Sequence, residues 1–299
     1  MTLGQAYNEF MLDKKAQGIT DKSLVSYKDI LHIFIDYIGE NIPIESIGIN
    51  DMRKYAIMLR NKKLSQATQA TYMRNVKIFM RWIQDEYGLA FDAKKIRVPK
   101  SPKKKVKIYD NGDIEHIFSG IKSKVEWIEI RNKAMVALML DSGLRQCELC
   151  RLKRADINQK EKYIIVYGKG NKERYVPIGE FALNILNAYY AICPYDGGCV
   201  FYNLDGSPLS GNAVRLFTHR LQRELGFKFT SHALRHNFAT HYIMDNLEER
   251  NTSGVYDLSI IMGHESIETT KSYEHLAHEI IAVKSSNSHL DKVFALSGA

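Results

Sequence analysis

The sequence lacks any apolar run close to the roughly 20 residues that a membrane-spanning helix needs. Its first residues, MTLGQAYNEF, have neither the basic nor the apolar region of a secretory signal. Hydrophobic residues nevertheless make up 45% of the 299 positions, which is enough to fill the cores of two ordinary domains. We therefore expect a globular cytoplasmic protein that does not contact a membrane.

Cysteine is also scarce, and its four positions are Cys147, Cys150, Cys193 and Cys199. The pair in RQCELCRL fits either a zinc or redox site or two small buried thiols. The pair falls inside one expected helix beside Leu149 and Leu152, which favours buried thiols. A metal site on His232, His236 and His241 would have no carboxylate or fourth ligand at helical spacing. We therefore expect no metal site.

Acidic residues are missing from one short segment. Residues 97–107, RVPKSPKKKVK, contain six basic residues, two prolines and no acid, within a chain of net charge +8. Such a segment should be extended, and it predicts a linker between two domains. Its excess charge favours a polyanionic partner, and a role in solubility is the alternative. The candidate phosphate contacts here are Lys103, Lys104 and Lys105.

Residues 1–96 show helical periodicity only. Four amphipathic helices are expected, from Thr2 toward Gly18, from about Thr20 to Ile38, after Asn50, and from about Ser65 to Gly88. This predicts a small helical bundle. The basic residues on or beside its last helix could face a DNA groove or simply solvent, and they are Lys62, Lys63, Arg74, Lys77 and Arg81.

Residues 108–299 show a mixed pattern. Helices are expected near residues 110–121 and 125–141, at SGLRQCELCRL, and from Phe181, Ser210 and Ser231. Between them, residues 162–167 (KYIIVY) and 174–179 (RYVPIG) read as two strands joined by the turn GKGNKE. This half is predicted to be mostly helical with a β-hairpin.

Several charged residues occur where uncharged ones would serve the fold. Arg145 starts a helix, where the macrodipole disfavours a cation, and Glu148 lies one turn on to hold its guanidinium. A surface ion pair is the alternative. His232 and Arg235 share one face at the start of another helix, an arrangement suited to phosphate. We expect His236 to be a packing or surface residue.

The turn of the hairpin carries lysines. Lys169 lies between two glycines, which let a backbone approach another molecule closely. It could also be a solvated turn residue, and Lys172 could equally be the lysine that matters. Farther along the chain, His264 directly follows Gly263, and Tyr273 comes nine residues later. A tyrosine by itself does not indicate a catalytic role, because most tyrosines only pack their rings.

The motifs SGLRQCEL, GKGNKER, HALRH, MGH and SYEHL occur in that order across residues 140–276. The series resembles the tyrosine recombinase (phage integrase) family, which includes the Xer recombinases and many transposon integrases. The resemblance implies a mainly α protein. A four-helix core-binding (SAM-like) domain would span residues 1–96, a basic linker residues 97–107, and a mostly α catalytic domain with a small sheet residues 108–299.

The resemblance also implies roles for individual residues. Arg145 and Arg235 would clamp the scissile phosphate, with His264 as a further donor. Lys169 would protonate the leaving 5′-hydroxyl, His232 would act in proton transfer, and Glu148 would orient its neighbours. Tyr273 would attack phosphorus and form a 3′-phosphotyrosyl intermediate. Because cationic side chains replace metal ions in this chemistry, no cofactor is expected.

The partners implied are double-stranded DNA and further copies of the chain. The stripe in SHLDKVFALSGA after Ser288 predicts a terminal amphipathic helix, which either covers its own domain or docks on a neighbour in a cyclic homotetramer on two DNA sites. The family resemblance also leaves room for an accessory DNA-bending or directionality factor. One departure from the family is the longer NLEERNTSGVYDLS segment before MGH, which puts the local route of the chain in question.

Three alternatives remain open at the level of sequence. A type IB topoisomerase would use the same chemistry on one duplex. A catalytically silent DNA-binding protein on the same scaffold would not depend on Tyr273. A metal-dependent nuclease would require a carboxylate cluster that the sequence does not show.

Overall fold

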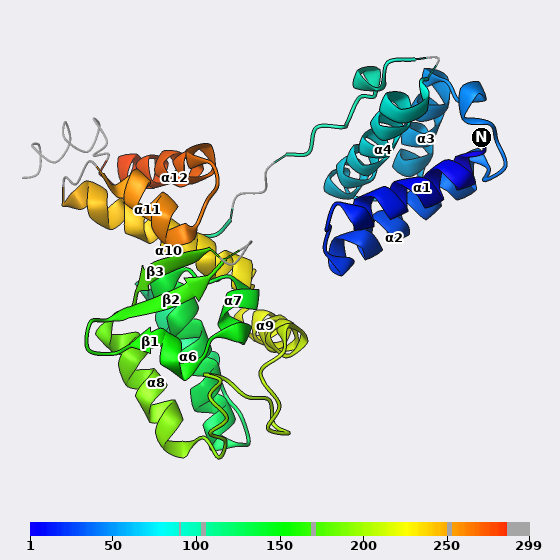
Figure 1. The fold of residues 1–299 in the computed structure, drawn as a ribbon. Coiled ribbons are helices and arrows are strands. Elements are labelled where there is room, and N and C mark those ends of the chain that lie inside the picture. Colours follow the sequence, from blue (N-terminus) through cyan, green and yellow to red (C-terminus); the bar gives the residue numbers. More distant parts are fainter. Residues whose placement is uncertain (90, 103–105, 169–171, 250–252, 286–299) are drawn as a thin grey trace, which may run out of the picture. The chain divides into compact units, whose positions relative to one another are not determined.

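The computed structural model describes residues 1–89, 91–102, 106–168, 172–249 and 253–285. The chain divides into two units, Met1–Lys104 and Lys105–Ala299, and each is described by itself (Figure 1). Within the described residues no helix has the length and apolar character to cross a membrane.

The first unit is helical throughout. Its elements are α1 (Leu3–Ala16), α2 (Asp21–Ile38), η1 (Ile44–Ser46), α3 (Ile49–Asn61), α4 (Gln66–Tyr87) and η2 (Ala93–Lys95). Hydroxyl side chains of Thr2, Thr20 and Ser65 cap α1, α2 and α4, and Gly39 and Gly88 end two of these helices at positive φ. The expected four-helix bundle is thereby confirmed.

The third helix of this unit starts earlier than expected. It begins at Ile49 rather than after Asn50, because Gly48 is its N-cap and donates its N–H to Asp51 Oδ2 at 2.9 Å. Aromatic and aliphatic side chains from all four helices, including Phe10, Phe34 and Phe79, form the core between them.

The second unit is mostly helical around one small sheet. It contains α5 (Asn111–Gly120), α6 (Glu126–Ser142), α7 (Gln146–Arg151), η3 (Arg154–Asp156), α8 (Glu180–Ile192), α9 (Gly211–Leu225), α10 (Ser231–Glu248), α11 (Gly254–Met262) and α12 (Ile267–Ser285). The helix expected from Phe181 therefore begins one residue earlier. The mainly α architecture is confirmed.

The sheet contains one strand more than the predicted hairpin. Its order is β1 (Ile157–Asn158), β2 (Tyr163–Tyr167) and β3 (Glu173–Pro177), all antiparallel. The first expected strand, 162–167, was wrong only at its start, because Lys162 has a positive φ of 55° and β2 begins after it. The second, 174–179, was wrong at both ends, since β3 begins one residue earlier and ends two residues earlier. In β3, Arg174 and Val176 point to the buried face while their neighbours are exposed.

Two separate hydrophobic clusters stabilise the second unit. The larger one joins α5, α6, α7, α8, α9, the sheet and the first turns of α10. The smaller one joins the rest of α10 to α11 and α12, and its members include Phe238, Ile243, Met262 and Tyr273. Figure 1 shows α11 and α12 packed beside α10, with the sheet next to α11.

The start of the second unit is attached to α10. Asn237 is fully buried, accepts a hydrogen bond from Tyr109 N at 2.6 Å and donates one to Lys107 O at 3.1 Å. His241 lies 2.9 Å from Tyr109 O through its Nε2. The chain therefore enters this unit along the helix that carries His232 and Arg235.

Candidate active site

The first part of the site is the start of α7. Arg145 is the N-cap of this helix, and its backbone N–H and Nη1 donate to the two oxygens of Glu148 at 2.7 and 2.9 Å. Arg145 Nη2 donates to Gly263 O at 3.1 Å, while its side chain stays 37% exposed. The expected contact between Arg145 and Glu148 is present, and the guanidinium is fixed in direction while remaining accessible.

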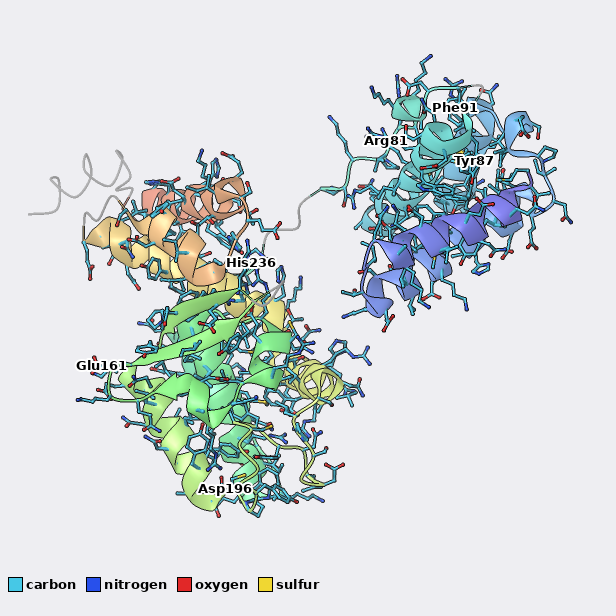
Figure 2. The ribbon with its side chains drawn as sticks, in the orientation of Figure 1. Arg81, Tyr87, Phe91, Glu161, Asp196 and His236 are labelled. Carbon is cyan, nitrogen blue, oxygen red and sulfur yellow. The ribbon has the colours of Figure 1, made fainter. Side chains whose placement is uncertain are left out.

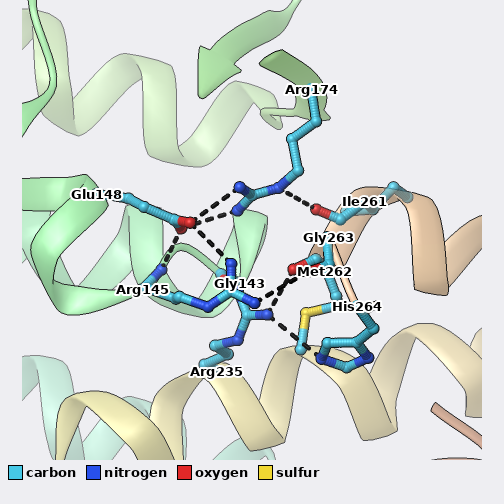
Figure 3. Close-up of polar contacts among 9 residues, drawn as sticks. All are labelled: Gly143, Arg145, Glu148, Arg174, Arg235, Ile261, Met262, Gly263 and His264. Atoms are coloured by element: carbon cyan, nitrogen blue, oxygen red, sulfur yellow. Dashed lines mark hydrogen bonds and ion pairs between the residues drawn. The ribbon is translucent and has the colours of Figure 1, made fainter. Parts of the chain in front are cut away.

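Arg235 on α10 reaches the same place from below (Figure 3). It is buried, and it donates to Gly143 O and to Met262 O, the latter at 2.7 Å. Its Nη2 lies 3.4 Å from His264 Nε2. All of these acceptors are uncharged, so the positive charge of Arg235 is not neutralised by a bonded carboxylate.

A third arginine, Arg174 on β3, belongs to the cluster and was missed from the sequence. Its Nη1 and Nη2 donate to Glu148 Oε1 and Oε2 at 2.9 and 2.8 Å, and its Nε donates to Ile261 O at 2.8 Å. The signal that could have revealed it is strand alternation, since Arg174 shares the inward face with Val176. A charged side chain that points to the buried face of a strand requires a hydrogen-bonding or oppositely charged partner.

The cluster carries an excess of positive charge. Arg145 and Arg174 both bond the carboxylate of Glu148, whose side chain is only 4% exposed, while the guanidinium of Arg235 bonds backbone carbonyls. Burial acts to raise the pKa of Glu148, but the bonds from Arg174 and Arg145 outweigh it and lower this pKa below its usual value. Burial, with the nearby Arg145, lowers the pKa of Arg235 to about 10. Because guanidinium groups stay charged in proteins, the pocket attracts an anion.

His264 and Tyr273 lie beside this charge. His264 Nδ1 lies 2.8 Å from Thr270 Oγ1, which orients the ring, and burial with the charges of Arg235, Arg145 and Arg174 lowers its pKa to about 4. The ring is therefore neutral at pH 7. The Tyr273 ring is stacked on that of His264 with centroids 6.2 Å apart. Tyr273 is thereby placed next to a pocket with an excess of two positive charges.

The Tyr273 side chain is 5% exposed. Burial raises the pKa of its phenol, while Arg235 and Arg145 oppose the shift. The phenol is protonated at neutral pH, and the two arginines stabilise the phenolate that forms when it loses its proton.

His236 was expected to be a packing or surface histidine, and it is half-buried against Tyr273, with ring centroids 5.0 Å apart. Its Nε2 is 3.0 Å from Nε2 of His232 (Figure 2 labels His236 on α10). Burial first, then His232 and Lys228, lower the pKa of His236 to about 4. His236 thus lies between His232 and Tyr273.

The start of α10 is built as expected. Thr230 is the N-cap, and its hydroxyl accepts a hydrogen bond from Ala233 N at 3.1 Å. His232 is exposed in the first turn, and burial of part of its ring, with Arg235 and Lys228 nearby, lowers its pKa. The described residues thus bring together Arg145, Arg235, His232, His264, Tyr273 and Glu148.

Comparison with known proteins identifies the family. The family model described as "Phage integrase family" matches residues 107–279, and the model "Phage integrase, N-terminal SAM-like domain" matches residues 7–88. The chain belongs to the phage integrase family. It is thus a relative of the tyrosine recombinases, as the five motifs indicated.

Curated relatives of this integrase-family chain match most of its length. It is 31% identical over 249 residues to the tyrosine recombinase XerC of Alcanivorax borkumensis, covering 80% of this chain and 79% of the relative. It is 25% identical over 273 residues to XerD of Listeria innocua, covering 87% and 90%. The integrase of transposon Tn1549, solved in complex with circular intermediate DNA, has the same fold, with a TM-score of 0.76, 18% identity and full coverage of both chains.

Other positions predicted for this integrase lie outside the described residues. These are Lys169, Lys103, Lys104, Lys105 and the terminal stripe after Ser288. Lys172 is described and exposed, and its carbonyl accepts a hydrogen bond from Gly168 N at 2.9 Å, which closes the hairpin turn.

The basic residues predicted in the first unit differ in their surroundings. Lys62, Lys63 and Arg74 are exposed, and Arg81 makes a surface ion pair with Asp85 at 3.8 Å (Figure 2 labels Arg81 on α4). Lys77 instead donates from Nζ to the carbonyls of Lys94 and Ile96, both at 3.0 Å. Its ammonium group therefore fastens η2 to α4.

The two thiols of the CxxC pair in α7 differ in exposure, so the expectation that both are buried was wrong for Cys147. Cys147 is exposed and Cys150 is half-buried, and burial raises the pKa of the Cys150 thiol to about 11. A thiol with so high a pKa is a poor source of the thiolate that zinc or redox chemistry uses. In the described part of the chain no group of three or more metal-ligating side chains is assembled.

Proposed function

We propose that this chain is a site-specific DNA recombinase that cleaves and rejoins strands through a covalent 3′-phosphotyrosyl intermediate. The observation that carries the proposal is the juxtaposition of Tyr273 with a pocket in which Arg145 and Arg174 bond the carboxylate of Glu148 and Arg235 bonds backbone carbonyls. A phosphodiester is the anion that a tyrosine at such a pocket would attack. Family membership and the Xer relatives support the same reaction.

The arginines would act on the charge of the phosphate. Arg145 and Arg235 would each donate hydrogen bonds to its non-bridging oxygens, and they would hold it more strongly as negative charge develops in the pentacoordinate transition state. His264 Nε2, 3.4 Å from the Arg235 guanidinium, would donate a further hydrogen bond there. Glu148 would fix the direction of Arg145.

Proton transfer would accompany the exchange of bonds at phosphorus. The Tyr273 Oη–P bond forms as the P–O5′ bond breaks, the phenolic proton leaves through His236 and His232, and the departing 5′-oxygen takes a proton from Lys169. The reverse attack by a 5′-hydroxyl releases the tyrosine and reseals a strand. Each step balances without ATP because the phosphotyrosine keeps the energy of the broken phosphodiester.

The remaining parts of the chain would bind DNA and other copies. Residues 1–96 would hold the duplex with Lys62, Lys63, Arg74 and Arg81, the linker 97–107 would cross the phosphate backbone, and residues 108–299 would carry the chemistry. Strand exchange between two sites requires four nucleophiles. We propose a homotetramer in which the terminal segment of each copy docks on its neighbour, acting with an accessory DNA-bending or directionality factor.

The test is covalent capture on a nicked DNA substrate. Candidate duplexes from the DNA flanking the gene are nicked near the exchange point, so that the cleaved fragment diffuses away. The wild type is incubated with them in EDTA and run on a denaturing gel beside Tyr273→Phe. We expect a shifted protein–DNA band with the wild type alone.

Each other outcome would indicate a different function for this protein. Tight binding without attachment would indicate a silent DNA-binding scaffold, and cleavage that EDTA abolishes would indicate a metal-dependent nuclease. Attachment without joining of two different duplexes would indicate a topoisomerase. In all three cases the proposal of recombination would be abandoned.

A further inference from the structure

His264 lies between a group that can only donate hydrogen bonds and a group that can both donate and accept them. Its Nε2 is 3.4 Å from Arg235 Nη2, as Figure 3 shows, and its Nδ1 is 2.8 Å from Thr270 Oγ1. A guanidinium has no acceptor, whereas a hydroxyl can take either role. Burial and the nearby arginines lower the pKa of His264 to about 4, so at pH 7 the ring is neutral and only one of its nitrogens carries a proton. The partners of the two nitrogens decide which one carries it.

In the free protein one tautomer of His264 satisfies both contacts. Arg235 Nη2 donates, so His264 Nε2 accepts, and the proton lies on Nδ1, which donates to Thr270 Oγ1. In the proposed function Nε2 has the opposite role, because it donates to a non-bridging oxygen of the phosphate. With the proton on Nε2, two donors face each other at Arg235 and His264 unless an anion lies between them. Binding of a phosphate thus requires the other tautomer.

The hydroxyl of Thr270 makes both tautomers possible. Thr270 is fully buried, and among the described residues its hydroxyl is bonded to His264 Nδ1 alone. The buried Thr240 on α10 instead donates its hydroxyl proton to a carbonyl one turn earlier, His236 O, at 3.0 Å. The hydroxyl proton of Thr270 can therefore turn toward Nδ1 once Nδ1 has lost its own proton. A carbonyl or carboxylate oxygen in this place would only accept, and it would keep the proton on Nδ1.

The place of Thr270 is set by the helix that carries the tyrosine. Thr270 and Tyr273 lie one turn apart on α12, so they share a face of this helix, and both are buried. The Tyr273 ring is stacked on that of His264. The turn that presents His264 is closed by the backbone N–H of this residue, which donates to Ser259 O at 3.1 Å. The hydroxyl and the proposed nucleophile therefore reach His264 from one helix.

We propose that Thr270 is a positioning residue whose hydroxyl lets His264 exchange its tautomer when a phosphate enters the pocket. The inference rests on the proposed function, in which His264 Nε2 donates to the phosphate. On binding, Nδ1 gives a proton to water and Nε2 takes one, so the charge of the ring does not change. The Thr270 hydroxyl then donates to Nδ1, while Nε2 and Arg235 both donate to the anion. Thr270 does not itself contact the reacting atoms.

The first test detects the tautomer directly and needs no DNA. The whole chain is produced with isotope-labelled histidine, and the ring nitrogens of His264 are followed in two-bond proton–nitrogen correlation spectra. Their signals are identified by their absence in His264→Gln. At pH 7 we expect the proton on Nδ1 in the wild type, and a move to Nε2 as inorganic phosphate is added. A proton on Nε2 before phosphate is added, or the same tautomer before and after, would overturn the proposal.

Matched variants assign this exchange to the Thr270 hydroxyl. Thr270→Val keeps the shape of the side chain but gives Nδ1 no partner, so we expect both tautomers to be present before phosphate is added. Thr270→Ser keeps the hydroxyl and should match the wild type. The control is Thr240→Val, which removes an equally buried hydroxyl that bonds only the carbonyl of its own helix, and it should leave the tautomers of His264 unchanged. A Thr270→Val protein with the spectra of the wild type would show that the hydroxyl has no such role.

The second test measures the rate of covalent attachment to nicked DNA at saturating protein. Removing an oxyanion donor outright costs about 100- to 1000-fold, and Thr270→Val only weakens one, so we expect attachment to slow about 10-fold. DNA affinity should not change, because Thr270 is fully buried, and Thr270→Ser should recover most of the rate. Equal rates in Thr270→Val and the wild type, or a serine variant as slow as the valine variant, would contradict the inference. A wild type that exchanges the tautomer of His264 but never attaches to DNA would count against the proposed function alone.

Discussion

Replacing Glu148 with glutamine should destabilise the second unit strongly. The carboxylate accepts four hydrogen bonds, from Arg145 N at 2.7 Å, Arg145 Nη1 at 2.9 Å, and Arg174 Nη1 and Nη2 at 2.9 and 2.8 Å. Glutamine removes the negative charge and places an amide donor against one guanidinium. Removing one partner of a buried ion pair costs about 3–5 kcal/mol, and for a unit of this size that lowers Tm by about 6–20 °C.

The effect should also depend on pH. Because the folded pKa of Glu148 is lowered, its contribution is complete above the ordinary carboxyl pKa of about 4.5 and is lost as pH falls through the lower folded value. The wild type should therefore lose unfolding free energy below pH 4.5 more steeply than Glu148→Gln. The difference in unfolding free energy between the wild type and Glu148→Gln should be largest at pH 7.

The assay is urea unfolding followed by tryptophan fluorescence. The chain has two tryptophans, and Trp82→Phe leaves Trp127, which packs on the larger core of the second unit, as the reporter. Glu268→Gln is the control, because that glutamate forms an exposed pair with Lys271 and its loss should cost less than about 1 kcal/mol.

A double variant tests whether this loss of stability comes from the unpaired guanidinium of Arg174. If the cost of Glu148→Gln arises from the uncompensated Arg174, then adding Arg174→Met should recover part of it, with a coupling of about 1–3 kcal/mol. A loss below 1 kcal/mol in Glu148→Gln, or strict additivity in the double variant, would refute the claim that this carboxylate holds the cluster together.

Four further predictions follow from residues other than Glu148 and Arg174. Lys77→Ala should lower the stability of the first unit by about 1 kcal/mol and leave the salt dependence of DNA binding unchanged, because its ammonium binds carbonyl groups. Arg74→Ala should do the reverse, reducing the slope of log affinity against log salt by about 1, and a slope equal to that of the wild type would remove it from the interface. Since the pKa values of His264 and His236 are lowered to about 4, unfolding free energy should fall as pH decreases from 6.5 toward 4, and replacing both by glutamine should flatten that part of the curve in urea titrations. Gly143→Ala should be destabilising by several kcal/mol in the same assay, because its φ is +60° and a Cβ would lie 2.3 Å from the Phe238 ring, and a loss under 1 kcal/mol would contradict that geometry.

The helices could be predicted because their signals are local. Thr2, Thr20 and Ser65 are followed by apolar residues at helical spacing, and glycines end the same helices, so start and stop are both visible in the sequence. Strand ends are harder to predict. Lysine has no preference for positive φ, so the positive φ of Lys162 comes from the turn around it. The short β1 has two residues and no periodicity to detect.

The site was predictable where the residues follow one another within a motif. Arg145 and Glu148 are three residues apart on one helix, and His232 and Arg235 share a first turn. Arg174 was overlooked, and the contact of His236 with Tyr273 was not predicted, because both residues make their contacts across the tertiary structure. Strand alternation could have indicated that Arg174 points inward, but no spacing rule identifies the partner it finds there.

Tyr273 packs in the smaller hydrophobic cluster of the second unit, so the stability of its position depends on that cluster. Tyr273 belongs to the cluster of α10, α11 and α12, whereas Arg145, Glu148 and Arg174 are anchored on elements of the larger one. Polar bonds from Arg174, Arg235 and Arg145 to the carbonyls of residues 261–263 join the two. We expect a local opening of α11 and α12 to cost the burial of the smaller cluster, the packing of Ile261 on the larger one and these bonds, and to move Tyr273 away from the arginines. We therefore expect the residues that pack α11 on α10 to set how often Tyr273 lies beside the arginine pocket.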